Sequence, residues 1–160
     1  MTSAPVIDMR QALSPGLLRR LASILYDTLV LIALAVIVAT IAVALKKGPI
    51  TSASGYWRPM LQLAMTLVGM AFYLWFWTHG GQTLGMKAWR LVLVTDQGAI
   101  PGYGHAALRL AASLLSWLPL GLGYLWVLVD RDHLSWHDRL SGTRLVLILP
   151  PRSADRSANR

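Results

Sequence analysis

The sequence predicts an all-α polytopic membrane protein with two transmembrane helices, a third apolar helical segment that is broken or re-entrant, and short cytoplasmic strands. Residues 21–45 contain no charge except Asp27, and residues 60–77 have only Gln62 and Thr66 as polar interruptions. Apolar residues make up 55% of the chain and charged residues 14%, whereas a soluble domain carries about 25% charged residues. A chain of 160 residues with this composition is expected to form one domain in a lipid bilayer.

The first transmembrane helix is predicted at residues 17–45, after a cytoplasmic tail formed by residues 1–16. The apolar run at residues 21–45 would be roughly 37 Å long as a helix, and the hydrocarbon core of a bilayer is about 30 Å thick. Its uninterrupted part, residues 28–45, is also longer than the roughly 7 to 15 apolar residues of a cleaved signal sequence. We therefore expect this helix to remain in the membrane.

The second transmembrane helix is predicted at residues 57–78. Tyr56 and Trp57 lie at one end of this segment, and Trp75 and Trp77 lie at the other end. Aromatic side chains gather at the two surfaces of a membrane, so their placement is typical of a segment that crosses completely. The two helices are expected to form a transmembrane hairpin.

An amphipathic segment follows at residues 82–98. Lys87 and Arg90 interrupt it, so it is too polar to span the bilayer. Residues 90–94, with the sequence RLVLV, nearly repeat at residues 144–148 as RLVLI, and both are rich in residues that favour strands. The two strands are able to pair only if they lie on the same side of the membrane.

The third apolar segment is predicted as a broken helix over residues 105–130. It contains Arg109 near its start and the helix breakers Pro119, Gly121 and Gly123 in its middle. One interpretation is a single kinked span. The other is a helical hairpin that enters the membrane and returns to the same face, with each half too short to cross alone.

The distribution of Lys and Arg favours the hairpin. If the third segment crossed once, the two sides of the membrane would carry six and nine positive residues. If it returns, only Lys46, Lys47 and Arg58 lie outside and the other twelve lie inside, as the positive-inside rule prefers. We therefore expect both termini in the cytoplasm, with a cytoplasmic segment at residues 133–149 and a basic disordered tail at residues 150–160.

Asp27 is the residue within the apolar runs that most needs an explanation. A carboxylate near the centre of a bilayer costs about 2.5 to 3.5 kcal/mol and usually has a partner. Arg20 lies on the same helix face but about 10 Å away along the axis, too far for a direct salt bridge. The partner is expected to be Arg109, Lys87 or a hydroxyl group of a neighbouring segment, while Asp138 is placed to pair with Arg20.

The sequence does not predict an enzyme, a metal site or a cofactor site. The chain has no Cys, and no Ser, His and Asp residues are ordered as a nucleophile with its base. His133 and His137 would share a face on a helix but lack a clear third ligand. Residues 80–87 fail the phosphate-loop pattern because Met86 occupies the position of its lysine. Nucleic acid is not an expected partner either, because the basic residues flank apolar segments instead of lining a soluble face.

Three blocks of sequence resemble the RDD family of small integral membrane proteins. They are residues 20–27 (RLASILYD), residues 81–87 (GQTLGMK) and residues 137–144 (HDRLSGTR), and the resemblance extends over about residues 17–149. The one arginine and two aspartates that name the family fall on Arg20, Asp27 and Asp138. Five further residues are candidates for supporting this polar cluster: Gln82, Gly85, Lys87, Arg109 and His137. The resemblance implies a multi-pass protein of the bacterial plasma membrane.

The resemblance also implies a role in transport, with cation/proton exchange as one form of it, but it names no substrate. In the transport hypothesis Asp27 binds the ion or proton, Arg20 sets its charge state and Asp138 completes the site. The competing hypothesis is a membrane interaction or assembly protein in which the same three residues hold the fold together. Two or three crossings form a thin wall for a pathway, so transport is expected to need a homo-oligomer or a partner membrane protein.

Overall fold

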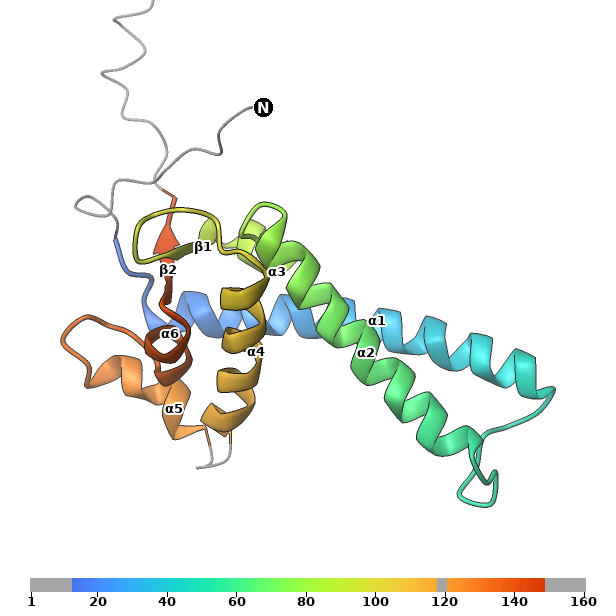
Figure 1. Ribbon diagram of the computed structural model, residues 1–160. Helices are drawn as coiled ribbons and strands as arrows, with labels where there is room; N and C mark the ends of the chain where they lie inside the picture. Colours follow the sequence, from blue (N-terminus) through green and yellow to red (C-terminus); the bar gives the residue numbers. More distant parts are fainter. Residues whose placement is uncertain (1–12, 118–120, 149–160) are drawn as a thin grey trace, which may run out of the picture.

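The computed structural model describes residues 13–117 and 121–148, and it is mostly helical (Figure 1). Two long helices, α1 (Leu17–Lys46) and α2 (Trp57–Thr78), form a hairpin that extends to one side of the molecule. The remaining elements gather around the opposite end of this hairpin, and we call them the cap, residues 84–117 and 121–148. Residues 1–12 of the tail predicted at residues 1–16, and the whole of the tail predicted at residues 150–160, lie outside the described residues.

The helices α1 and α2 are the two candidate membrane-spanning helices that the sequence predicts. Both are long and apolar enough to cross a bilayer. The residues of α1 that are buried inside the protein are all polar: Arg20, Ser23 and Asp27. Its leucines, isoleucines and valines are mostly exposed. A helix with polar residues inside and apolar residues outside is suited to lipid, which solvates the apolar face.

The cap contains five short helical elements and two strands. They are α3 (Leu84–Ala88), β1 (Leu91–Thr95), α4 (Tyr103–Trp117), α5 (Leu122–Leu125), the 3₁₀ helix η1 (Trp126–Leu128), α6 (Trp136–Ser141) and β2 (Thr143–Leu147).

The two near-repeated sequences form the sheet of the cap. Strands β1 and β2 pair in antiparallel fashion, with Leu91 opposite Leu147 and Thr95 opposite Thr143. A further bridge joins Leu13 to Leu147, so the segment before α1 also contacts this sheet. Every residue of β1 is buried. The apolar core therefore lies between the sheet, α2, α3 and α4, and its buried members are Trp77, Met86, Leu91, Leu93, Ala106 and Leu145.

The third apolar segment is broken in two. Helix α4 has 15 residues and ends at Trp117, so it is about 22 Å long and too short to cross a bilayer. Helix α5 begins at Leu122 and packs back against the end of α4, where Gly123 lies so close to Ser116 that a Cβ atom would collide with it. The predicted breaker Pro119 lies outside the described residues. Within the described residues, only α1 and α2 have the length and apolarity of a membrane span.

Candidate functional site

The buried face of α1 positions two separate polar clusters. Arg20, Ser23 and Asp27 follow one another at spacings of three and four residues, which places all three on one side of the helix. This face is turned toward the cap, where α3 contacts the helix around Ser23 and Asp27. The clusters separate along α1, because Arg20 lies near the start of the helix and Asp27 lies two turns further on.

The first cluster joins Arg20, Asp138 and Arg109. The Arg20 Nη1 donates to Asp138 Oδ2 at 2.8 Å, and the Arg109 Nη1 donates to Asp138 Oδ1 at 2.6 Å. The three side chains are 7%, 0% and 3% exposed in the order Arg20, Asp138, Arg109. One carboxylate thus holds two guanidinium groups that come from α1 and α4, and it connects the first membrane helix to the cap.

The backbone of α6 holds Asp138 in place. Ser135 and Asp138 form the capping box of this helix, in which the backbone N–H of Ser135 donates to Asp138 Oδ2 at 3.0 Å. Burial raises the pKa of Asp138, but the positive charges of Arg109 and Arg20 and the hydrogen bond from Ser135 outweigh this effect and hold the pKa below its usual range. Asp138 is therefore ionised at physiological pH and forms a charged link.

Both arginines also make contacts beyond Asp138. Arg20 donates to the backbone oxygens of His133 at 2.9 Å and Pro15 at 3.3 Å. Arg109 donates to Thr143 Oγ1 at 2.8 Å, and its guanidinium carbon lies 5.4 Å from the centre of the Trp77 ring. These contacts tie the segment before α1, the loop before α6, strand β2 and the end of α2 to one charged centre.

The second cluster surrounds Asp27. Thr83 Oγ1 donates to Asp27 Oδ2 at 2.6 Å, and the backbone N–H of Gly85 donates to Oδ1 at 2.8 Å. Asp27 is 2% exposed, and within residues 13–117 and 121–148 it forms no salt bridge. Of the three kinds of partner that the sequence allows for Asp27, the structure has the hydroxyl group, and neither Arg109 nor Lys87.

Gly85 is required where α3 packs against α1. A Cβ atom at this position would collide with the backbone oxygen of Ser23 and would lie 3.0 Å from the Asp27 carboxyl group. Thr83 is the N-cap residue of α3 and also accepts from the backbone N–H of Met86 at 3.2 Å. The block GQTLGMK therefore supplies the hydroxyl group, the free N–H and the close approach that Asp27 needs.

The sequence was compared with models of known protein families. The model described as the RDD family matches residues 14–142. The match covers most of the 160 residues and contains Arg20, Asp27, Asp138 and their side-chain partners Thr83 and Arg109. Thr143, which accepts from Arg109, lies one residue beyond it. The chain belongs to the RDD family. No curated protein and no solved structure matches the chain.

The other residues of the middle RDD block lie apart from both carboxylates. Lys87 is exposed, and Gln82 donates from Nε2 to the backbone oxygen of Leu91 at 2.5 Å. Gln82 thus fixes the chain between α2 and β1. Neither residue is brought to Asp27, although Gln82 directly precedes Thr83 and Lys87 follows Gly85 by two residues.

His137 borders the first cluster of this RDD protein. Its Nε2 atom lies 2.9 Å from Ser135 Oγ and 4.0 Å from Asp138 Oδ1, and its ring packs on Tyr124. Burial, together with the positive charge of Arg109, lowers the pKa of His137 to about 3. The imidazole is therefore neutral at physiological pH and adds no charge to the cluster.

The two histidines of the last RDD block do not form a pair of ligands. His133 lies in the loop before α6 with a φ angle of 54°, whereas His137 is inside the helix. The two residues therefore do not share one face of a helix, as the four-residue spacing in the sequence would allow. Within the described residues there is no group of three or more His, Asp or other acidic ligands that would hold a metal ion.

Sequence reasoning missed three polar residues of the two clusters: Thr83, Ser135 and Thr143. For two of them, the local sequence contains a pattern that could have identified them. Thr83 precedes a short helical segment as an N-cap residue does, and Ser135 stands three residues before Asp138, the spacing of a capping box. Thr143 lies on β2 beside Arg109 only because of the tertiary fold, and no local pattern indicates it.

Proposed function

We propose that this RDD protein is a non-enzymatic, multi-pass protein of the bacterial plasma membrane, with its cap on the cytoplasmic side. The bridge between Leu13 and Leu147 and the salt bridge between Arg20 and Asp138 support a position of the cap beside the first residues of α1. Twelve of the fifteen Lys and Arg residues lie outside the segment from Lys46 to Arg58, so the positive-inside rule favours the cytoplasm for the cap.

In this proposal α4, α5 and η1 form a re-entrant unit that is immersed in one leaflet. Exposed apolar side chains on these elements and just after η1 support it: Leu114 is 66% exposed, Leu128 is 63% exposed and Val129 is 76% exposed. Such side chains are costly in water but are solvated by lipid at a membrane surface. Helix α4 alone is too short to cross.

The proposed activity is transport of a cation or small solute, with Asp27 as the group that binds a proton or cation. One observation carries this proposal: Asp27 is a buried carboxylate on a membrane-spanning helix, and its partners Thr83 and Gly85 are neutral donors. A carboxylate without a cation beside it gains or loses a proton without breaking a salt bridge. Arg20 and Asp138 have a different role in this proposal, because their mutual salt bridge joins the cap to α1.

Transport in this form requires more than one chain. Two membrane-spanning helices do not enclose a pathway, so we propose a homo-oligomer or a complex with another membrane protein. The exposed apolar face of α1 gives such an assembly a surface within the membrane.

The test is cation-dependent proton flux in proteoliposomes that contain the purified protein. We expect flux with the native chain and none with Asp27→Asn, because the amide neither binds nor releases a proton. The matched control is Asp96→Asn, which changes an exposed carboxylate that binds Arg144 in the cap. Flux that persists in Asp27→Asn, or that is absent from the native chain under all cation gradients, would rule out this mechanism.

A second candidate function is membrane interaction or assembly without transport. It is favoured by the closed surroundings of Asp27, where each carboxylate oxygen already accepts a short hydrogen bond and Gly85 leaves no free space beside it. In this case Asp27→Asn lowers the melting temperature of the purified protein, and neither the native chain nor the variant carries flux. Measuring both quantities on the same preparations separates the two functions.

A further inference from the structure

A groove lies between the two candidate membrane-spanning helices, at residues 28–38 of α1 and 65–69 of α2. Its volume is about 260 Å³. The hydroxyl group of Thr28, at one end of the groove, already donates to the backbone oxygen of Ile24. The rest of the lining is apolar and includes Leu31, Ala35 and Val38 from α1 and Met65, Val68 and Gly69 from α2. Because both helices are candidate spans, the groove lies at the depth of the acyl chains.

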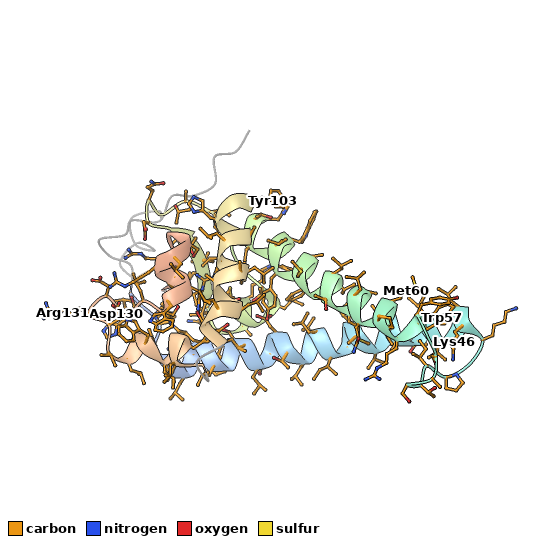
Figure 2. The ribbon with its side chains drawn as sticks, turned by 60° about the horizontal axis from the view of Figure 1, so that its bottom comes forward. Lys46, Trp57, Met60, Tyr103, Asp130 and Arg131 are labelled. Atoms are coloured by element: carbon orange, nitrogen blue, oxygen red, sulfur yellow. The ribbon has the colours of Figure 1, made fainter. Side chains whose placement is uncertain are left out.

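Uncompensated positive charge marks the end of the hairpin beyond this groove. Lys46, Lys47 and Arg58 lie around the connection between α1 and α2, and Figure 2 labels Lys46 and Trp57 close together there. Residues 28–95 contain no acidic residue. Lys46 Nζ donates to the backbone oxygen of Pro49, whereas Lys47 and Arg58 are exposed.

The position of these charges relative to the groove matches the shape of a phospholipid. Val38 precedes Lys46 by eight residues on α1, which is about 12 Å along a helix. Met65 follows Arg58 by seven residues on α2, which is about 10 Å. A phosphate group held at the end of the hairpin would therefore direct its acyl chain along the helices and into the groove.

We propose that an anionic phospholipid binds to the hairpin, with its phosphate group at Lys47 and Arg58 and one acyl chain in the groove. The charges provide the selectivity, because an acyl chain exchanges one apolar environment for another when it leaves the bilayer for the groove. The groove contributes packing contacts that hold the chain in one place. This site is separate from Asp27, and its test does not depend on transport.

The selectivity is tested by native mass spectrometry of the purified protein in detergent with phosphatidylglycerol or phosphatidylcholine. We expect the native chain to retain phosphatidylglycerol preferentially. The variant Lys47→Gln/Arg58→Gln should bind it on the order of tenfold more weakly, since each cation near an anionic surface contributes to attraction. The matched control, Arg90→Gln/Arg131→Gln, removes two exposed charges from the cap and should bind as the native chain does. Equal retention of the two lipids by the native chain, as for annular lipid only, would overturn the proposal.

The groove is tested separately with Gly69→Leu. A Cβ atom at Gly69 meets nothing within 4 Å, so the leucine side chain should fill the groove without disturbing the helix. We expect weaker retention of phosphatidylglycerol, with unchanged helix content by circular dichroism. Ala71→Leu adds the same bulk at an exposed position on α2 outside the groove and should have no effect. If Gly69→Leu leaves lipid retention unchanged, or dissociates a dimer without releasing lipid, the groove does not hold an acyl chain.

Discussion

At the scale of single residues, Arg20, Asp27 and Asp138 make two different kinds of contact. Arg20 and Asp138 form a salt bridge between α1 and the cap, and Arg109 shares the same carboxylate. Asp27 binds only neutral donors of the segment around α3. A buried carboxylate between two guanidinium groups is held ionised and acts as a structural link. A buried carboxylate without a neighbouring cation is able to take up or release a proton without breaking an ion pair.

Gly85 is the residue on which the contact between α1 and α3 depends most directly. We expect Gly85→Ala to lower the free energy of unfolding by about 1 to 3 kcal/mol, because the added methyl group would collide with the backbone oxygen of Ser23. Thermal unfolding in detergent measures this loss. Gly69→Ala is the control, since a Cβ atom there meets nothing within 4 Å. An unchanged melting temperature for Gly85→Ala would show that α3 does not pack against α1 as described.

His137 and Asp138 make stability depend on pH in one direction. The folded protein lowers the pKa of His137 to about 3 and that of Asp138 below its usual range. The unfolded chain therefore binds more protons. Stability falls through His137 as the pH falls from about 6.5 toward 3, and through Asp138 as the pH falls below about 4, by at most ~1.4 kcal/mol per pH unit for each group. Above about pH 6.5 neither group makes the free energy of unfolding depend on pH.

The melting temperature measured between pH 7.5 and pH 4 checks this dependence. His137→Gln should remove the part of the slope between about pH 6.5 and pH 4, because only the histidine begins to titrate there in the unfolded state. The control is His105→Gln, which changes an exposed histidine at the start of α4. A slope that is the same in His137→Gln and in the native chain would contradict a buried, neutral His137.

At the scale of elements, the sequence predicts best what local pattern determines. The two long apolar runs predict α1 and α2, because length and apolarity, which make a helix a candidate membrane span, are both local properties of the sequence. The near-repeat of RLVLV and RLVLI predicts two strands, and these segments pair as β1 and β2. The partner of Asp27 remained open between a cation and a hydroxyl group, because the choice depends on how α3 packs against α1.

The placement of Arg109 shows why the remaining contacts of the two polar clusters could not be predicted from the sequence. Its position near the start of the third apolar segment is equally compatible with a contact to Asp27 and with a contact to Asp138. The structure decides for Asp138 because the capping box of α6 turns that carboxylate toward α4. The pairing of Arg20 with Asp138 was predictable, since the seven-residue spacing excludes Asp27 as its direct partner.

Helix α4 should present its exposed face to lipid if α4 and α5 form a re-entrant unit. A fluorophore attached to Leu114→Cys is expected to show a blue-shifted emission in vesicles, because Leu114 is 66% exposed on the protein and would lie among acyl chains. The same fluorophore at Gln97→Cys, in the exposed turn after β1, should report water. Matching water-like spectra at the two positions would place α4 outside the membrane.

At the scale of the whole molecule, the contacts of the cap favour the proposed topology with two crossings. Two crossings return the chain to the side on which it began, and the cap then meets the first residues of α1 through Leu13 and Arg20. A third crossing would carry α6 and β2 to the opposite side, away from Arg20 and β1. The salt bridge and the sheet thus depend on an even number of crossings.

The chain contains no Cys, so a single introduced cysteine reports its own side of the membrane. Ala53→Cys lies at an exposed position in the connection between α1 and α2, and Gln97→Cys lies at an exposed position in the cap. We expect a membrane-impermeant maleimide to label Ala53→Cys in intact spheroplasts and to label Gln97→Cys only after permeabilisation. Labelling of both cysteines in intact spheroplasts would exclude a cytoplasmic cap, and labelling of Gln97→Cys alone would reverse the orientation of the hairpin. Labelling of both cysteines would mean that α1 crosses without α2, which would separate Arg20 from Asp138 and leave their salt bridge impossible. In the reversed orientation the salt bridge would form on the outer surface, where the positive-inside rule disfavours the twelve cations that accompany it.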